Sequence, residues 1–258
     1  MTNYLDGCGP SLHIQGTGDP ISSTVMVQFT RAQHRYLVRI TGGCGFMTPQ
    51  DAHGLYDLYA DAFRGDFKGA FLFGGTQMRR KDTPDTVIPS ITEVVPCIRR
   101  RCPNTVALGV VPRIEIDGNI QHLQLVRTGI LVYDEPGEEY YTQIHPEQDM
   151  CVVVQGSADQ GVMWDAEMLF ARKAAQLLSQ GAGWKQLLIS YNGGGVTEKE
   201  ILQWAQLGWP VLLINGSGRT TEKYANDAQF LSDHPNVHVV ERTSASIRTK
   251  LIELGAIA

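Results

Sequence analysis

Two glycine-rich turns in the C-terminal half of the sequence each follow a short apolar run. The first, residues 192–197 (NGGGVT), separates residues 187–191 from a helical pattern, and the second, residues 215–221 (NGSGRTT), follows residues 210–214. Glycines let the backbone approach a phosphate closely, and N–H groups at the start of a helix point toward an anion. Because Arg219 in the second turn can add paired donors to phosphate or ribose oxygens, the two turns together predict a nucleotide site.

The elements that position these turns repeat along the chain. Apolar, β-branched runs alternate with segments of helical periodicity, a pattern typical of a parallel sheet covered on both faces. The expected strands are residues 36–41, 69–73, 105–111, 150–154, 187–191, 210–214 and 237–240. The expected helices run from about residue 49 to residue 64, over 91–101, from about 164 to 178, and over 246–254. We therefore predict a single α/β domain over residues 1–258, with a Rossmann-like parallel sheet and helices on both faces.

Two segments depart from this alternation. The first block of the chain is expected to form an N-terminal hairpin. Residues 113–148 are predicted to be an irregular polar insertion with an added β-hairpin, because residues 117–118 and 136–137 are typical of hairpin turns. Tyr140 and Tyr141 in this insertion could stack on a base or pack the insertion onto the sheet, and we favour packing.

Glycine follows several of the other expected strands as well. Parallel strands deliver their carboxyl ends to one edge of a sheet, so we expect ligand contacts along that edge. The candidate ligand-binding residues are Thr41, Gly42, Gly43, Gly74, Gly75, Thr76, Gly156, Ser157, Arg172, Gly193, Gly194, Gly195, Thr197, Gly216, Ser217, Gly218 and Arg219. Arg79 and Arg80 come soon after one of these turns and are expected to form a positive lip for an anion.

Arg172 belongs to the helix with the clearest periodicity in the chain. Apolar residues repeat at helical spacing from residue 164 to residue 178, and Arg172 falls at the edge of their stripe together with Asp165. An arginine in this position can reach the rim of a cleft while its stem packs on the core. Contact with a ligand and a surface ion pair with Asp165 are equal alternatives.

The overall composition disfavours several classes of function. The 258 residues are 43% hydrophobic, enough for a core, and their formal net charge of -5 disfavours binding to DNA or RNA in spite of the basic run at residues 99–101. No apolar run has membrane-spanning length and the N-terminus lacks a signal-peptide pattern, so we expect a cytoplasmic protein. The five cysteines are an odd number, which fits a reducing compartment. Cys97 and Cys102 do not have the spacing of a zinc site, and we expect no metal and no cofactor.

Residues 192–197 and 210–219 resemble the end of the N-terminal sensing region of the melastatin-type TRP channels, which belongs to the SLOG family, also called LSDAT. Residues 216–219 (GSGR) match that region as they stand. The similarity extends back through residues 41–43, 74–76, 105–112 and 152–173. The resemblance implies a Rossmann-like domain that binds an NAD-derived nucleotide, with ADP-ribose as the channel example. Since the 258 residues contain no channel segment, the chain is similar to a soluble prokaryotic version of that sensor.

A more distant resemblance is to the LOG (lysine-decarboxylase-like) nucleotide hydrolases, which release a base from a nucleoside monophosphate. They use an arginine on one helix and the glutamate of a Pro-Gly-Gly-x-Gly-Thr-x-x-Glu turn. The resemblance gives Arg172 and Glu200 these catalytic roles and places Thr197 on the threonine of the turn. Asn192 replaces the proline, and Val196 replaces the third glycine, whose missing Cβ would allow the closest approach of a phosphate.

Thr197 and Glu200 also have a purely structural explanation. A threonine followed three residues later by a glutamate is a capping box at the start of a helix, and we favour this role over acid–base chemistry for Glu200. We therefore predict a sensor domain for an ADP-ribose-like or other NAD-derived nucleotide. The alternative is an N-glycosidic hydrolase of LOG type. The identity of the nucleotide, the effector protein and a homodimeric state are left open.

Overall fold

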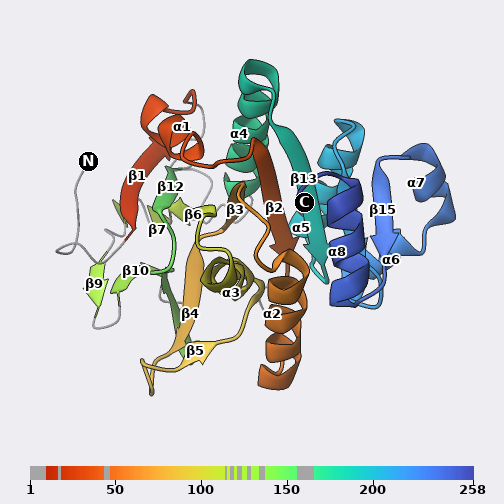
Figure 1. Cartoon of the computed structure of the whole chain (residues 1–258). Helices are drawn as coiled ribbons and strands as arrows, with labels where there is room; N and C mark the ends of the chain where they lie inside the picture. Colours follow the sequence, from red (N-terminus) through yellow and green to blue (C-terminus); the bar gives the residue numbers. More distant parts are fainter. Residues whose placement is uncertain are drawn as a thin grey trace.

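The computed structural model describes residues 10–16, 19–43, 47–113, 115–116, 119–120, 124–126, 129–133, 137–155 and 166–258. Within these residues, a sheet of eight strands forms the centre of the molecule (Figure 1). In spatial order the strands are β1 (Ser11–Gly16), β12 (Met150–Gln155), β6 (Val106–Arg113), β3 (Ala70–Gly74), β2 (Tyr36–Gly42), β13 (Lys185–Tyr191), β14 (Val211–Ile214) and β15 (Val237–Val240). Every neighbouring pair runs parallel. The predicted Rossmann-like α/β fold is confirmed.

The order of the strands reverses between β2 and β13. From β2 the chain adds β3, β6 and β12 on one side, and then returns through helix α4 (Ala166–Ala182) to add β13, β14 and β15 on the other. From β6 to β15 this is the order 3-2-1-4-5-6 of Rossmann sheets. Because the connections that follow β2 and β13 turn away in opposite directions, the reversal leaves a crevice outside the carboxyl ends of these two strands.

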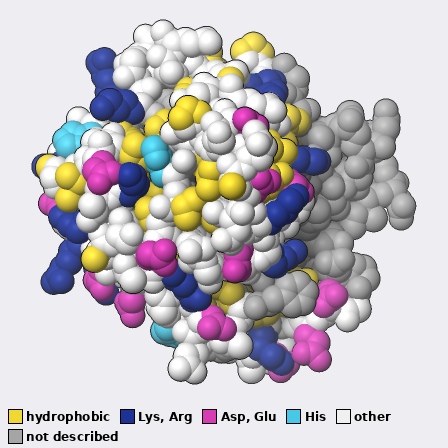
Figure 2. Space-filling view, turned by 90° about the vertical axis from the view of Figure 1, so that its right-hand side faces the viewer, with side chains coloured by type: hydrophobic (Ala, Val, Ile, Leu, Met, Phe, Trp, Pro, Cys, Tyr) yellow, Lys and Arg dark blue, Asp and Glu magenta, His cyan; other side chains and the backbone are white. Residues whose placement is uncertain are grey.

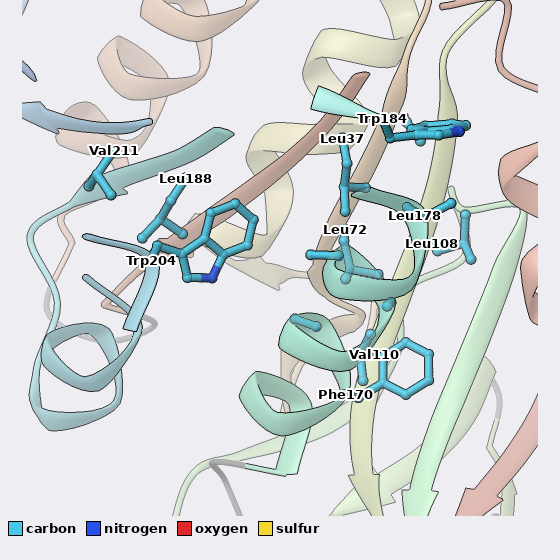
Figure 3. Packing of buried hydrophobic residues seen from close by; sticks show 14 of the residues in the cluster. Leu37, Leu72, Leu108, Val110, Phe170, Leu178, Trp184, Leu188, Trp204 and Val211 are labelled. Carbon is cyan, nitrogen blue, oxygen red and sulfur yellow. The ribbon is translucent and has the colours of Figure 1, made fainter. Parts of the chain in front are cut away.

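Helices cover both faces of the parallel sheet. The first face is covered by α1 (Ser23–Phe29), α4, α5 (Gly195–Gln206), α6 (Arg219–Ala225) and α7 (Ala228–Asp233), and the second by α2 (Pro49–Phe63), α3 (Val94–Arg101) and α8 (Ser244–Glu253). Side chains alternate between the two buried clusters along each strand, so that Leu37 joins the first and Val38 the second. Figure 3 shows residues of the first cluster, including Phe170 of α4 and Trp204 of α5.

A second, antiparallel sheet packs beside the first. In order it contains β5 (Val87–Ile88), β4 (Thr76–Arg80), β11 (Tyr140–Ile144), β10 (Gly129–Tyr133) and β9 (Gln124–Val126). The predicted hairpin in residues 113–148 is confirmed by the pairing of β10 with β11, and a short hairpin joins β7 (Glu115–Ile116) to β8 (Asn119–Ile120). β4 follows directly on β3, and its pairing with β11 is not expected from the sequence, because β4 is polar and its partner lies far along the chain.

The described part of the N-terminal segment, residues 10–16 and 19–35, forms a strand and a helix in place of the expected hairpin. Within the described residues, β1 pairs in parallel with β12 at the edge of the main sheet, and the chain continues into α1. Ser22 caps this helix, since its Oγ accepts a hydrogen bond from the Val25 N–H at 3.3 Å. Val25 and Phe29 lie four residues apart and are fully buried. The hairpin prediction was wrong because a serine cap and apolar residues at helical spacing specify a helix here.

Charges of both signs are spread over the face of the molecule shown in Figure 2. On the face shown in Figure 2, the dark blue Lys and Arg side chains are interspersed with the magenta Asp and Glu side chains, and the described residues show no continuous basic field there. In the described part of the chain, no helix is both long enough and apolar enough to cross a bilayer.

Candidate functional site

A cavity of about 470 Å³ opens at the switch point between β2 and β13. Its walls come from the carboxyl ends of β2 and β3, the starts of α4, α5 and α6, the second sheet, and the 3-10 helix η1 (Ile91–Glu93). The lining residues are Arg39, Ile40, Thr41, Gly42, Gly43, Gly74, Thr76, Met78, Ser90, Ile91, Thr92, Tyr140, Thr142, Glu167, Gly194, Gly195, Val196, Thr197 and Arg219. The volume lies in the range of small-molecule sites.

The glycine turn after β13 brings the N-terminus of α5 to this cavity. Asn192 and Gly193 have left-handed backbones, with φ angles of 58° and 91°. A Cβ on Gly193 would lie 2.3 Å from Thr197 Oγ1, so a larger residue does not fit. The helix begins at Gly195 with Gly194 as its N-cap, and Gly194 supplies no side-chain cap. The N–H groups of the first turn are therefore available at the cavity, with the positive end of the helix dipole behind them.

Arg219 lies across the mouth of the cavity. It is the first residue of α6 and has a left-handed backbone with φ of 49°. Its Nη1 lies 3.5 Å from the position that a Cβ on Gly43 would occupy, and its Nη2 lies 3.0 Å from the corresponding position on Gly194. Arg219 therefore spans the turn after β2 and the turn before α5, and its charge adds to that of the helix N-terminus.

A buried cluster of three charged side chains forms the floor. Arg39 points from β2 toward α4 and α5, where its Nε donates to Glu200 Oε1 at 2.9 Å and its Nη2 donates to Glu167 Oε1 at 3.3 Å. Arg39 and Glu200 are buried, whereas the side chain of Glu167 retains 20% exposure at the cavity. Among the described residues, Arg39 Nη1 and Glu200 Oε2 are buried without a hydrogen-bond partner.

The three charges change one another's ionisation. Burial alone would lower the pKa of Arg39, but the carboxylates of Glu200 and Glu167 outweigh it and raise that pKa above its ordinary value. Burial raises the pKa of Glu167 to about 7, while the guanidinium of Arg39 opposes the rise. Near neutral pH the cavity-facing carboxyl is therefore present in both protonation states.

The capping box predicted for Thr197 and Glu200 is wrong. Because α5 begins at Gly195, both residues lie inside the helix, and Glu200 is turned into the core against Arg39. A buried arginine needs a partner of opposite charge, and pairing with Arg39 therefore outweighs the local capping pattern in setting the orientation of Glu200. Sequence reasoning missed Arg39, although an arginine in the middle of an apolar strand (YLVRIT) is the signal of such a pair.

Several other predicted residues do not line the cavity. On α4 it is Glu167, five residues before Arg172, that reaches the cavity, and Arg172 is half-buried outside the lining. Gly75 packs on the backbone of Gly109, where an added Cβ would lie 2.7 Å from the Gly109 Cα. Gly156 and Ser157 lie outside the described residues.

The second glycine turn supports the first turn from behind. Ser217 Oγ accepts a hydrogen bond from the Asn192 N–H at 3.0 Å, and Thr221 donates from its backbone N–H and its Oγ1 to the Asn192 carbonyl at 3.1 and 2.7 Å. Gly216 and Gly218 have φ angles of 70° and 88° and shape this turn. Ser217 and Thr221 thus hold the turn after β13 in place, and Arg219 is the member of this segment that reaches the cavity.

The remaining wall is rich in hydroxyl groups. It contains Thr76 and Thr142 of the second sheet and Ser90 and Thr92 beside η1. Tyr140 lies in the same wall, whereas the neighbouring Tyr141 is buried as expected for packing onto the sheet. Stacking of Tyr140 on a base stays a prediction.

Arg79 and Arg80 do not form the expected anion lip. The guanidinium of Arg79 donates to Gln77 Oε1 and to the Pro84 carbonyl. Arg80 pairs with Asp82 at 2.9 Å. These nearby acceptors direct both arginines away from the cavity, and neither side chain lines it.

The fold and the site together define a class: an open, doubly wound α/β domain of Rossmann-like type with a cavity at its switch point. A family model described as "SLOG in TRPM, prokaryote" matches residues 91–255. The chain belongs to this family. The matched region contains α4, both glycine turns and Arg219, but it begins after β2, so Arg39 and residues 41–43 lie outside it.

Solved structures resemble the chain at low sequence identity. The structural genomics target TM1055 is 18% identical, with a TM-score of 0.47 over 84% of this chain and 98% of its own. The Moco carrier protein of Chlamydomonas reinhardtii is 15% identical, with a TM-score of 0.48 over 86% and 98%. The molybdenum cofactor binding protein of Rippkaea orientalis is 14% identical, with a TM-score of 0.46 over 86% and 98%. A comparison with curated proteins found no match.

Proposed function

We propose that this chain is a sensor domain that binds an ADP-ribose-like or other NAD-derived nucleotide at the switch-point cavity. The observation that carries the proposal is the meeting of the α5 N-terminus and Arg219 at the mouth of the cavity. Backbone N–H groups and a guanidinium are the donors that phosphate oxygens prefer, and open α/β sheets bind ligands at this position. The family membership supports the same interpretation.

Binding without hydrolysis is favoured by the position of Glu200. In the hydrolase resemblance this glutamate acts on the ligand, but here it is buried, paired with Arg39 and absent from the cavity lining. Arg172, the other catalytic candidate, also lies outside the lining. A residue within hydrogen-bond reach of the reacting atoms is the first requirement of acid–base catalysis.

Arg219→Ala tests the binding site. Loss of a charge-assisted contact to phosphate corresponds to about 1.5–3 kcal/mol, so we expect ADP-ribose to bind about ten- to a hundredfold more weakly to the variant in isothermal titration calorimetry. Arg31→Ala is the matched control, because its side chain is 57% exposed and lies outside the cavity lining. Equal affinities of Arg219→Ala and the parent protein would remove Arg219 from the site. Absence of any nucleotide binding by the parent would overturn the proposed function.

The hydrolase remains a second candidate because of Glu167. A cavity-facing carboxyl with a pKa of about 7 is suited to general acid–base chemistry near neutral pH. Chromatography of AMP, NAD and ADP-ribose after prolonged incubation separates the two functions. A sensor returns each nucleotide intact, whereas repeated release of base that is lost in Glu167→Gln would establish the enzyme.

A further inference from the structure

Arg39 and Glu167 lie side by side at the floor of the cavity. Arg39 Nη1 is buried and has no hydrogen-bond partner among the described residues, although Arg39 lines the cavity. In the neighbouring Glu167, Oε1 accepts a hydrogen bond from Arg39 Nη2. The other carboxylate oxygen, Oε2, lies at the end of β3, 3.3 Å from the position that a Cβ on Gly74 would occupy. A buried donor without a partner is rare in folded proteins, and at a cavity it points to an acceptor on a ligand.

The sign of charge differs between the mouth and the floor. The mouth has the helix N-terminus and Arg219, both positive. At the floor two carboxylates, Glu167 and Glu200, share one guanidinium, so ionisation of all three groups leaves an excess of negative charge. A phosphate is attracted to the mouth and repelled from the floor. The floor instead suits a neutral group that both accepts and donates hydrogen bonds, and a hydroxyl has this capacity.

We propose that Glu167 and Arg39 bind the sugar hydroxyls of the nucleotide whose phosphate is held by the N-terminus of α5 and Arg219, an inference that rests on the proposed function. In this orientation a hydroxyl accepts from Arg39 Nη1 and donates to the Glu167 carboxylate. Thr76 and Thr142 of the surrounding wall carry hydroxyl groups that would be further partners for a polyol. Glu167 is then a residue that determines specificity for ribose over deoxyribose.

The test compares nucleotides that differ by one hydroxyl. AMP, 2′-deoxy-AMP and 3′-deoxy-AMP carry the same phosphate and base, and calorimetry at about pH 8 keeps Glu167 mostly ionised. We expect at least one deoxynucleotide to bind the parent roughly ten- to a hundredfold more weakly than AMP, the size of a hydrogen bond to a charged group. In Glu167→Ala and in the volume-conserving Glu167→Gln, this ratio should fall toward one. In Arg219→Ala the affinities for all three nucleotides should fall by a similar factor, so that the ratio of AMP affinity to deoxynucleotide affinity is unchanged.

The outcomes separate this inference from the proposed function. AMP binding to the parent with equal affinity for both deoxynucleotides would overturn the inference and leave nucleotide binding intact. If the ratio of AMP affinity to deoxynucleotide affinity stayed the same in both Glu167 variants, the inference would also be overturned, because other residues would then bind the hydroxyl. If the parent binds none of the three nucleotides or ADP-ribose, the proposed function fails and the inference falls with it. Thermal unfolding of each variant, with Arg31→Ala as the control, identifies any loss of fold. The comparison of AMP with the two deoxynucleotides on the parent protein does not depend on any variant.

Discussion

Arg39 joins two carboxylates with different surroundings in one buried cluster. Glu200 is sealed in the core by α5, while Glu167 reaches the cavity from α4. A guanidinium suits this position because it stays charged and directs separate donors to separate partners. Removal of Arg39 would leave two neighbouring carboxylates without a counter-charge, so both glutamates depend on the guanidinium.

The ionisation of Glu167 should make the stability of the fold depend on pH. Its pKa is about 7 in the folded protein, against an ordinary value of 4.5. Between these values the folded state binds more protons than the unfolded state, so the free energy of unfolding falls as the pH rises from about 4.5 to 7. Glu167→Gln removes this titration. The stability of the parent relative to the variant, measured by urea unfolding, should therefore decline across this range and level off above it, and a difference independent of pH would contradict the argument.

The element that prepares the site is the turn between β13 and α5. Two consecutive left-handed residues, Asn192 and Gly193, reverse the chain so that the helix starts immediately at the cavity. The second turn fixes this conformation through Ser217 and Thr221, which bond to the main chain of Asn192. Gly193 and Gly195 therefore differ in how strongly the backbone requires glycine, and alanine substitutions test this difference.

Gly193→Ala and Gly195→Ala form a matched pair. The first introduces a side chain at a left-handed position, at a cost of roughly 1–2 kcal/mol, and adds a clash with Thr197. The second places its Cβ where no atom lies within 4 Å, on the first residue of a helix. We expect Gly193→Ala to lower the urea midpoint clearly and Gly195→Ala to leave it nearly unchanged. Similar midpoints for the two variants would show that the turn does not constrain residue 193.

Local patterns of the sequence were sufficient for most elements but not for the contacts between them. Apolar runs and glycine exits located every strand of the parallel sheet except β1, because buried parallel strands are apolar on both faces. The partner of Glu200 could not be found in this way, since Arg39 lies 161 residues away while a capping residue stood three positions before Glu200. The pairing of β4 with β11 is equally remote. Of the candidate site, the glycine mouth was predictable, and the charged floor, which depends on packing between α4, α5 and β2, was not.

At the scale of the whole molecule, the cavity lies where two differently built sheets meet. β3 of the parallel sheet runs directly into β4 of the antiparallel sheet, and a buried polar network joins them to η1. In this network His145 Nδ1 accepts from the Glu147 N–H at 3.0 Å, so its Nε2 carries the proton and donates to Glu93 Oε2 at 3.1 Å. Gln77 donates to the same carboxylate at 3.3 Å.

Loss of His145 should loosen the second sheet selectively. His145→Leu leaves the buried Glu93 carboxylate without one of its donors, a change of about 1–3 kcal/mol. In hydrogen exchange followed by mass spectrometry we expect roughly tenfold or faster exchange in β4 and β11, with β13 and β14 unchanged. His34→Ala, at an exposed turn, serves as the control. Equal acceleration in both sheets would mean that the network stabilises the molecule as a whole rather than the junction.

The left-handed backbones of Asn192 and Arg219 also bear on the speed of recognition. Both belong to turns that the protein's own hydrogen bonds hold in place, so their strain is offset during folding. A mouth shaped in this way would need no rearrangement to receive the nucleotide of the proposed function, which favours rapid association. Differences among nucleotides then appear mainly as differences in residence time. Under the proposed sensor function, the residence time of the nucleotide would set how long a signal persists after the free ligand has disappeared from solution.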